Sequence, residues 1–288
     1  MEDYLIIYNP ASGSASKKKL EEVEEYLTQK KVRYKTLHTK KRGDALEWGK
    51  EAAQNNIKAV VAIGGDGTIN EVVNGIAGSE TGLVIVPTGT ANVLAKELGL
   101  SKEIPQLLEK SLQETSRKIS LGKLTINDHE TYFTMMVGVG FDAEAVHELS
   151  LDFKNTFGKI AYFISAAKTH VTGVLKETKV IVDDIEYRCS FLVASNIKRY
   201  GGNFIVTPQA HIEDGELDFL MVTTRNKLKF FKALIYILLK RHLRLKEVIY
   251  LKGNFVEILN KNHVQLDGDY TGKGVSSIKS IKNTLKVY

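Results

Sequence analysis

A glycine-rich turn joins an apolar strand segment to a helical one early in the chain. Residues 64–68 read Gly-Gly-Asp-Gly-Thr; they follow the apolar residues 59–63 and precede a helical pattern that begins at Ile69. Such a turn exposes backbone N–H groups at a helix N-terminus, where the helix dipole favours phosphate. Because Asp66 would repel a bare phosphate, we expect it to hold Mg²⁺ that bridges phosphate oxygens. The alternative is a tight turn capped by Thr68.

Two further loops follow strand segments in the same part of the chain. Residues 8–13 read Tyr-Asn-Pro-Ala-Ser-Gly, and residues 87–92 read Pro-Thr-Gly-Thr-Ala-Asn. Each by itself is compatible with an ordinary turn between a strand and a helix. In a doubly wound sheet, however, such strand ends lie at one edge, where ligands of that fold bind. The three loops together predict a phosphate-binding edge.

Acidic residues gather in two turns of the second half. Residues 208–218 contain Asp214 and Glu216, and residues 267–269 read Asp-Gly-Asp. Carboxylates and free carbonyls at a turn are hard oxygen ligands, so residues 208–218 are a candidate Mg²⁺ or Ca²⁺ loop. From the residues alone, an Asp-Gly hairpin turn is the simpler interpretation of both segments.

The elements that must position the three loops alternate between strand and helix. Strand patterns cover residues 4–8, 32–38, 59–63 and 83–86, and helical patterns cover residues 16–31, 43–56, 68–77 and 91–98. This alternation predicts right-handed βαβ crossovers and a mostly parallel, doubly wound sheet. The uninterrupted apolar runs at 60–63 and 83–86 are typical of the buried middle of such a sheet.

After about Ser120 the pattern changes, and strands follow strands. We expect strands at residues 118–126, 131–139, 178–182, 185–194, 216–222, 248–251, 254–259 and 263–266, with helices at 155–172 and 227–243. Turn formers such as residues 260–262 separate the strands, which is typical of an antiparallel sandwich. The expected domains are residues 1–120 and 121–274. A last strand at 277–287 has no assigned partner, and residues 275–288 could return to the first domain.

Cysteine content and hydropathy indicate the compartment. Cys189 is the only cysteine, which excludes an intramolecular disulfide, and the N-terminus lacks the basic flank and apolar stretch of a signal peptide. The longest apolar run, residues 233–239, is far below the roughly 18 residues that suggest a bilayer span. We therefore expect a cytoplasmic protein whose contact with membranes is peripheral.

The basic residues are concentrated in one stretch. The net charge is +6, and residues 219–246 hold eight Lys or Arg but no Asp or Glu. Residues 227–243 interleave these cations with aliphatic and aromatic residues, so a helix there could dock on an anionic membrane or pack into the core with a solvated basic edge. The stretch has no recognised nucleic-acid motif, and nucleic acid is not an expected partner.

The motifs resemble those of a known family. The chain is similar to the diacylglycerol kinase catalytic domain family in three motifs, in order and spacing: Asn9-Pro10 with Ser12-Gly13, Gly64-Gly65-Asp66-Gly67-Thr68 with Asn70-Glu71, and Pro87 with Gly89-Thr90 and Asn92. The similarity extends through the second half. It is greatest to the soluble bacterial diacylglycerol and related lipid kinases, which join a phosphofructokinase-like α/β nucleotide domain to a β-sandwich. One departure is visible, since the family commonly has Asp where Val93 stands.

The resemblance implies roles for particular residues. ATP would contact Asn9, Ser12, Gly13, Thr39, Gly64, Gly65, Asp66, Gly67, Thr68, Ile69, Asn70, Gly89 and Thr90. The side chain of Asp214 and the backbone carbonyls of His211 and Glu216 would hold a structural Mg²⁺. Asp269 would be the catalytic base, and Asp66, near the phosphates, would be a further catalytic residue. Asp267 is its nearest competitor, because Asp269 is shorter than the family's Glu.

The implied activity is an ATP- and Mg²⁺-dependent transfer of phosphate to the hydroxyl of diacylglycerol or a related lipid at a membrane surface. The product would be phosphatidic acid or an analogous lipid phosphate, and the resemblance makes a homodimer plausible. The sequence does not identify the lipid. Two alternatives stay open: an NAD kinase-like enzyme, which shares the Gly-Gly-Asp-Gly-Thr turn, and a non-catalytic protein that binds nucleotide or lipid without turnover.

Overall fold

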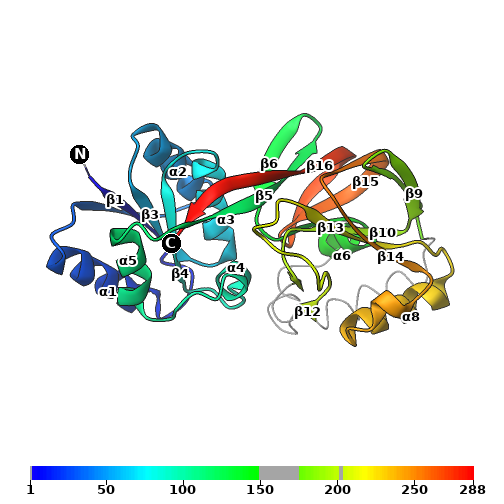
Figure 1. Ribbon diagram of the computed structural model, residues 1–288, viewed down its shortest axis with the longest axis horizontal. Helices are drawn as coiled ribbons and strands as arrows, with labels where there is room; N and C mark the ends of the chain where they lie inside the picture. The colour runs from blue at the N-terminus through cyan, green and yellow to red at the C-terminus, as the bar shows by residue number, and fades with distance from the viewer. Residues whose placement is uncertain (1, 149–174, 201–203) are drawn as a thin grey trace. The chain divides into compact units, whose positions relative to one another are not determined.

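The computed structural model describes residues 2–148, 175–200 and 204–288, which form two compact units (Figure 1). The first unit contains residues 1–121 and 281–288, and the second contains residues 122–280. Two strands, β5 (Arg117–Ile126) and β16 (Asp269–Val287), continue from one unit into the other. The helix expected at residues 155–172 lies outside the described residues.

A parallel sheet forms the centre of the first unit. Its strands are β1 (Tyr4–Tyr8), β2 (Tyr34–His38), β3 (Ala59–Gly64) and β4 (Gly82–Pro87), in the order β2-β1-β3-β4. The end of β16 adds beside β4, where Val287 lies opposite Leu83 in parallel register. β3 is buried along its whole length, as its uninterrupted apolar run predicts.

Helices cover both faces of this sheet (Figure 1). They are α1 (Ser16–Gln29), α2 (Asp44–Gln54), α3 (Asp66–Ile76), the short α4 (Val93–Glu97) and α5 (Ile104–Leu112). Leu27 of α1 and Leu107 of α5 share one core cluster with alternate strand residues such as Val61. The other face of the sheet carries α2 and α3, which pack against each other. The sequence pattern missed α5, although Pro105 in its first turn is a helix-start signal.

The second unit is built from antiparallel strands around one apolar core. The strands are β6 (His129–Phe133), β7 (Met136–Gly140), β8 (Thr178–Val182), β9 (Ile185–Cys189), β10 (Phe191–Ser195), β13 (Leu217–Val222), β14 (Val248–Gly253) and β15 (Phe255–Leu266). A short pair, β11 (Arg199–Tyr200) and β12 (Phe204–Ile205), stands apart. β13, β10, β7 and β15 are neighbours, and Phe219, Leu192, Val139 and Val264 from them meet in the core. Two helices, α6 (Phe141–Glu148) and α8 (Lys227–Leu238), follow β7 and β13.

The expected turn at residues 260–262 is wrong, because β15 runs through it as a single strand. Asn260 accepts a hydrogen bond from the backbone N–H of Lys179 at 2.9 Å and donates one to the carbonyl of Glu177 at 2.8 Å. These side-chain bonds to Lys179 of β8 and to Glu177 just before it satisfy the polar residue without a turn. The strand shifts its register against β16 between Ile258 and Asn262, and again between Val264 and Gln265.

Three other expected strands have different bounds. Residues 131–139 divide into β6 and β7 at Thr134 and Met135, and residues 185–194 divide into β9 and β10 at Ser190. At Ser190 the backbone N–H and the hydroxyl both donate to the carbonyl of Val222, which draws the chain out of its strand. The last strand, β16, begins at Asp269 instead of residue 277 because it pairs with β15 from that point.

Candidate functional site

Hydrogen bonds tie the three loops of the first unit together. Asn9 Nδ2 donates to Thr68 Oγ1 at 2.8 Å, and Ser12 Oγ lies 2.6 Å from Thr88 Oγ1. The backbone N–H of Thr88 donates to the carbonyl of Gly64 at 2.9 Å. These residues follow β1, β3 and β4, which are neighbours in the sheet. The loops therefore form one continuous surface at the carboxyl edge.

Two glycines of these loops are needed for different physical reasons. A Cβ at Gly89 would lie 2.7 Å from the Cα of Gly65, so close backbone packing requires the absence of a side chain there. At Gly67 a Cβ would meet nothing within 4 Å among the described residues. Packing does not explain this second glycine, and the close approach of a ligand to the backbone would account for it.

Asp66 is the first residue of α3, and a backbone hydrogen bond fixes the position of its side chain. Oδ1 of Asp66 accepts a hydrogen bond from the backbone N–H of Val93 at 2.7 Å. The side chain of Val93 is buried, so this residue contacts Asp66 through its backbone. The first N–H groups of an α-helix have no partners within the helix and favour an anion. An oriented carboxylate beside them is an oxygen ligand of the kind that Mg²⁺ prefers.

A cation that the sequence analysis missed also lies at these loops. Lys19 of α1 places Nζ 2.6 Å from the carbonyl oxygen of Pro87. Its position within the lysine run at residues 17–19 gave no sign of this contact. Thr39 follows β2 and donates its backbone N–H to the carbonyl of Tyr8 at 2.9 Å, so it lies at the same edge of the sheet.

The other expected nucleotide residues are divided between surface and core. Thr90 is exposed, Asn70 is half-buried, and Gly13 adopts a φ of 136° close to the carbonyl of Thr88. Ile69 differs, because its side chain is buried and its backbone N–H donates to the carbonyl of Gly65. The described geometry therefore gives Ile69 a role in the core of the first unit.

In the second unit, the two candidate base residues have different surroundings. Asp267 Oδ1 accepts hydrogen bonds from the backbone N–H groups of Met135 and Met136 at 3.1 and 2.8 Å. Its Oδ2 accepts from the N–H and the hydroxyl of Thr134 at 3.3 and 3.4 Å. Asp269 is exposed as the first residue of β16. Asp267 therefore closes the break between β6 and β7, and the geometry favours Asp269 as the carboxylate that a substrate can reach.

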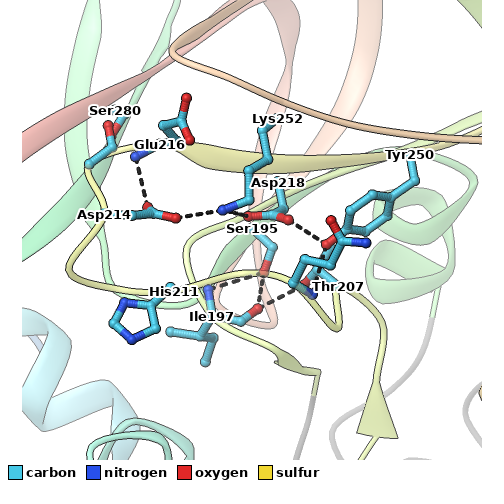
Figure 2. Close-up of polar contacts among 12 residues, drawn as sticks. Ser195, Ile197, Thr207, His211, Asp214, Glu216, Asp218, Tyr250, Lys252 and Ser280 are labelled. Carbon is cyan, nitrogen blue, oxygen red and sulfur yellow. Dashed lines mark hydrogen bonds and ion pairs between the residues drawn. The ribbon is translucent and has the colours of Figure 1, made fainter.

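The acidic loop of residues 208–218 contains a charge network that centres on a lysine (Figure 2). Lys252 Nζ lies 2.5 Å from Asp214 Oδ2 and 3.8 Å from Asp218 Oδ2. Asp214 Oδ1 accepts the N–H of Glu216 at 3.0 Å, and Asp218 accepts the hydroxyl of Tyr250. Burial raises the pKa of Asp218 and outweighs the attraction of the nearby ammonium. The hydrogen bond to Asp214 raises the pKa of Lys252.

The Mg²⁺ expected at His211, Asp214 and Glu216 stays a prediction. The carbonyl of His211 already accepts the N–H of Asp214 at 3.1 Å, and Lys252 supplies the positive charge at the carboxylate. Among the described residues, no group of three or more His, Cys, Asp or Glu side chains could hold a metal ion. As arranged, the loop fits an ammonium group, and a divalent cation would have to displace it. No local pattern in the sequence links Lys252 to the acidic loop, because β14 lies far along the chain from that loop.

Comparisons with known proteins match both units. The family described as diacylglycerol kinase catalytic domain matches residues 3–124, and the family described as YegS C-terminal NAD kinase beta sandwich-like domain matches residues 135–288. A diacylglycerol kinase from Bacillus subtilis (strain 168) is 30% identical over 280 residues, which cover 93% of this chain and 89% of the relative. A diacylglycerol kinase from Staphylococcus carnosus (strain TM300) is 28% identical, over 98% of this chain and 94% of the length of that relative.

Solved structures agree with these matches. A crystal structure described as a diacylglycerol kinase from Bacillus anthracis str. Sterne has a TM-score of 0.79 at 24% identity, over 99% of this chain and 96% of that chain. The fold class expected from the sequence, an α/β domain joined to an antiparallel β-sandwich, is thereby confirmed.

Proposed function

Because this chain belongs to the diacylglycerol kinase catalytic domain family, we propose that it transfers the γ-phosphoryl group of ATP to a lipid hydroxyl. The acceptor is diacylglycerol or a related lipid in a membrane surface, and the product is phosphatidic acid or an analogous lipid phosphate. The relatives named diacylglycerol kinase support this acceptor class. The observation that carries the proposal is the glycine turn at the start of α3, bonded to the loops after β1 and β4.

The first unit has the groups that phosphoryl donors require. Backbone N–H groups of the glycine turn and the dipole of α3 favour the phosphates, while Lys19 brings an ammonium group to the neighbouring loop. Bound Mg²⁺ would offset the charge of the phosphate oxygens, and Asp66 is the residue that would hold it. The bond from the N–H of Val93 keeps the Asp66 carboxylate oriented before nucleotide arrives.

The second unit supplies the proposed base. The carboxylate of Asp269 accepts the proton of the lipid hydroxyl as its oxygen forms a bond to the γ-phosphorus. The bond from that phosphorus to the β–γ bridging oxygen breaks, and ADP leaves. The exposed position of Asp269 supports this role, whereas four donors from residues 134–136 surround the carboxylate of Asp267.

The test is transfer of labelled phosphate from ATP to a panel of acceptors. The panel contains micellar diacylglycerol, monoacylglycerol, a sphingoid base, phosphatidylglycerol and undecaprenol, and it also contains NAD. We expect a labelled lipid with the natural protein and with Asp128→Asn, which changes an exposed turn aspartate of the same unit. We expect little product with Asp269→Asn or Asp66→Asn. Labelled NADP would support an NAD kinase, and ATP binding without any product would support a binding protein; either result overturns the proposal.

A further inference from the structure

Helix α8 carries apolar side chains on two opposite faces. The buried set is Phe230, Ala233, Leu234 and Ile237. The exposed set is Leu228, Phe231 and Ile235 of the helix and Leu239 at its C-cap, with exposed fractions of 83%, 44%, 38% and 59%. At 3.6 residues per turn, the two sets point in opposite directions from the helix axis. Core packing accounts for the first set and leaves the second without an explanation.

The buried face fixes the helix against the second unit. The ring of Phe230 packs edge-on against Phe141, with centroids 4.9 Å apart. The side chain of Asn226 caps the helix by accepting the N–H of Lys229 at 3.1 Å. After the helix, the buried His242 contacts the carbonyl of Val206 through Nε2 at 2.9 Å. A helix held in this way presents its outer face as a rigid surface.

The outer face forms one continuous row of apolar residues. Leu228, Phe231, Ile235 and Leu239 follow one another at intervals of three or four residues, and the exposed Leu243 lies in the short 3₁₀ turn that follows. We call the first four residues the α8 row. Single exposed apolar residues are common on proteins, but a contiguous row marks an interaction surface.

The charged residues of the segment that carries the α8 row all have one sign. Residues 219–246 contain eight Lys or Arg and no Asp or Glu. Lys232, Lys240 and Arg241 are exposed beside the row, and the Lys232 ammonium lies 5.4 Å from the ring centroid of Tyr236. Lys229 forms an ion pair at 3.0 Å with Glu247, just beyond the acid-free stretch. An occupant of this surface must accept apolar side chains and cations together.

We propose that the α8 row inserts into the headgroup boundary of an anionic lipid membrane. A row on a convex helix with flanking cations fits such a boundary, because acyl chains accept the apolar side chains while anionic headgroups accept the cations. No helix within the described part of the chain is long and apolar enough to span a bilayer. This inference rests on the proposed function, because a lipid kinase must reach an acceptor that lies in a membrane.

The first experiment measures binding to vesicles without any catalysis. The protein is sedimented with vesicles of phosphatidylcholine alone and of phosphatidylcholine mixed with phosphatidylglycerol. We expect binding to the mixed vesicles, and we expect the double variant Leu228→Ser/Phe231→Ser to weaken it by about tenfold or more. The matched control is Ile185→Ser/Val275→Ser, which removes two exposed apolar residues elsewhere in the second unit. Lys232→Gln/Lys240→Gln should weaken binding to the mixed vesicles and reduce its dependence on salt.

The second experiment separates this inference from the proposed kinase activity. The Leu228→Ser/Phe231→Ser variant should lose phosphorylation of vesicle-borne diacylglycerol but keep the rate on a water-dispersed short-chain diacylglycerol. If the protein binds vesicles through the row but phosphorylates no lipid, the result would support the inference and contradict the proposed kinase activity. Equal vesicle binding by the natural protein, the Leu228→Ser/Phe231→Ser variant and the Lys232→Gln/Lys240→Gln variant would overturn the inference. A second result would also overturn the inference: the natural protein is a dimer, the Leu228→Ser/Phe231→Ser variant is a monomer, and both bind vesicles equally. The occupant of the row would then be a second copy of the chain.

Discussion

Asp267, in the turn between β15 and β16, exchanges two hydrogen bonds with Met136 at the start of β7. The N–H of Met136 donates to Asp267 Oδ1 at 2.8 Å, and the N–H of Asp267 donates to the carbonyl of Met136 at 2.9 Å. The side chain of Asp267 thus replaces strand partners at the point where the chain breaks between β6 and β7. Two acidic residues separated by one glycine consequently have different surroundings, since Asp267 is bonded to backbone N–H groups and Asp269 is exposed.

Asp269→Asn should lower kcat without changing stability. An asparagine cannot take the proton of the acceptor hydroxyl, so we expect a loss of about 10²- to 10⁴-fold in lipid phosphorylation. The urea midpoint should stay that of the natural protein, because Asp269 is exposed. Full activity in this variant would remove Asp269 from the mechanism.

Asp267→Asn should have the opposite signature. An amide group in place of one carboxylate oxygen leaves N–H donors of residues 134–136 without an acceptor, which costs about 1–3 kcal/mol of unfolding free energy. The measurement is urea denaturation, with Asp128→Asn as the matched variant. Unchanged stability together with abolished transfer would show that Asp267 is the base.

Gly67→Ala should weaken ATP binding while leaving the protein at least as stable as before. The added methyl group has space in the protein itself, and alanine is favoured over glycine in a helix by about 1 kcal/mol. A phosphate held at the backbone would collide with it, so calorimetry should show a lower affinity for ATP. Gly89→Ala is the contrasting variant, because its methyl group would press on Gly65 and lower the unfolding midpoint. Unchanged ATP affinity in Gly67→Ala would place the phosphates elsewhere.

Lys252→Met should destabilise the second unit in a pH-dependent way. Removal of the ammonium leaves Asp214 and Asp218 without their cation, and we expect a cost of about 1–2 kcal/mol near neutral pH because the pair is only partly buried. Burial raises the pKa of Asp218, so the folded state takes up a proton there before the unfolded chain does. The penalty should therefore shrink as pH falls and Asp218 becomes neutral.

The same pair has an alkaline limit. Because Asp214 raises the pKa of Lys252, the stabilisation is present below the pKa of an ordinary lysine and is lost as pH rises through the folded value. Urea midpoints measured across pH give both limits, with the exposed Lys279→Met as control. A pH-independent penalty would contradict the charge network. Added Mg²⁺ should stabilise Lys252→Met more than the natural protein, since the ammonium no longer competes for Asp214.

Cys189 should resist alkylation until the protein unfolds. Burial raises the pKa of its thiol to about 12, so little thiolate is present at mildly alkaline pH. Mass spectrometry after iodoacetamide treatment should show modification only in urea, at the transition seen by circular dichroism. Modification of the native protein at the rate of a free thiol would contradict the buried position in the core of the second unit.

Local pattern was sufficient for the fold class and for most of the first unit. The apolar runs of β3 and β4, and the glycine turn between β3 and α3, follow from the spacing of neighbouring residues. Hydrophobic periodicity and turn chemistry act over a few residues, so the sequence itself displays them. The family motifs lie in these local segments as well, which is why the resemblance was visible.

Only the tertiary structure decided which polar residues are used by the fold. Asp267 is bonded to residues 134–136, and Lys252 to Asp214, although these partners are distant along the chain. Likewise, β15 passes through an expected turn because Asn260 bonds to β8 and to the residue just before it. The row on α8 became distinct from its buried face only when the neighbours of the helix were known. Long-range contacts determine burial and hydrogen-bond partners, and no local pattern contains that information.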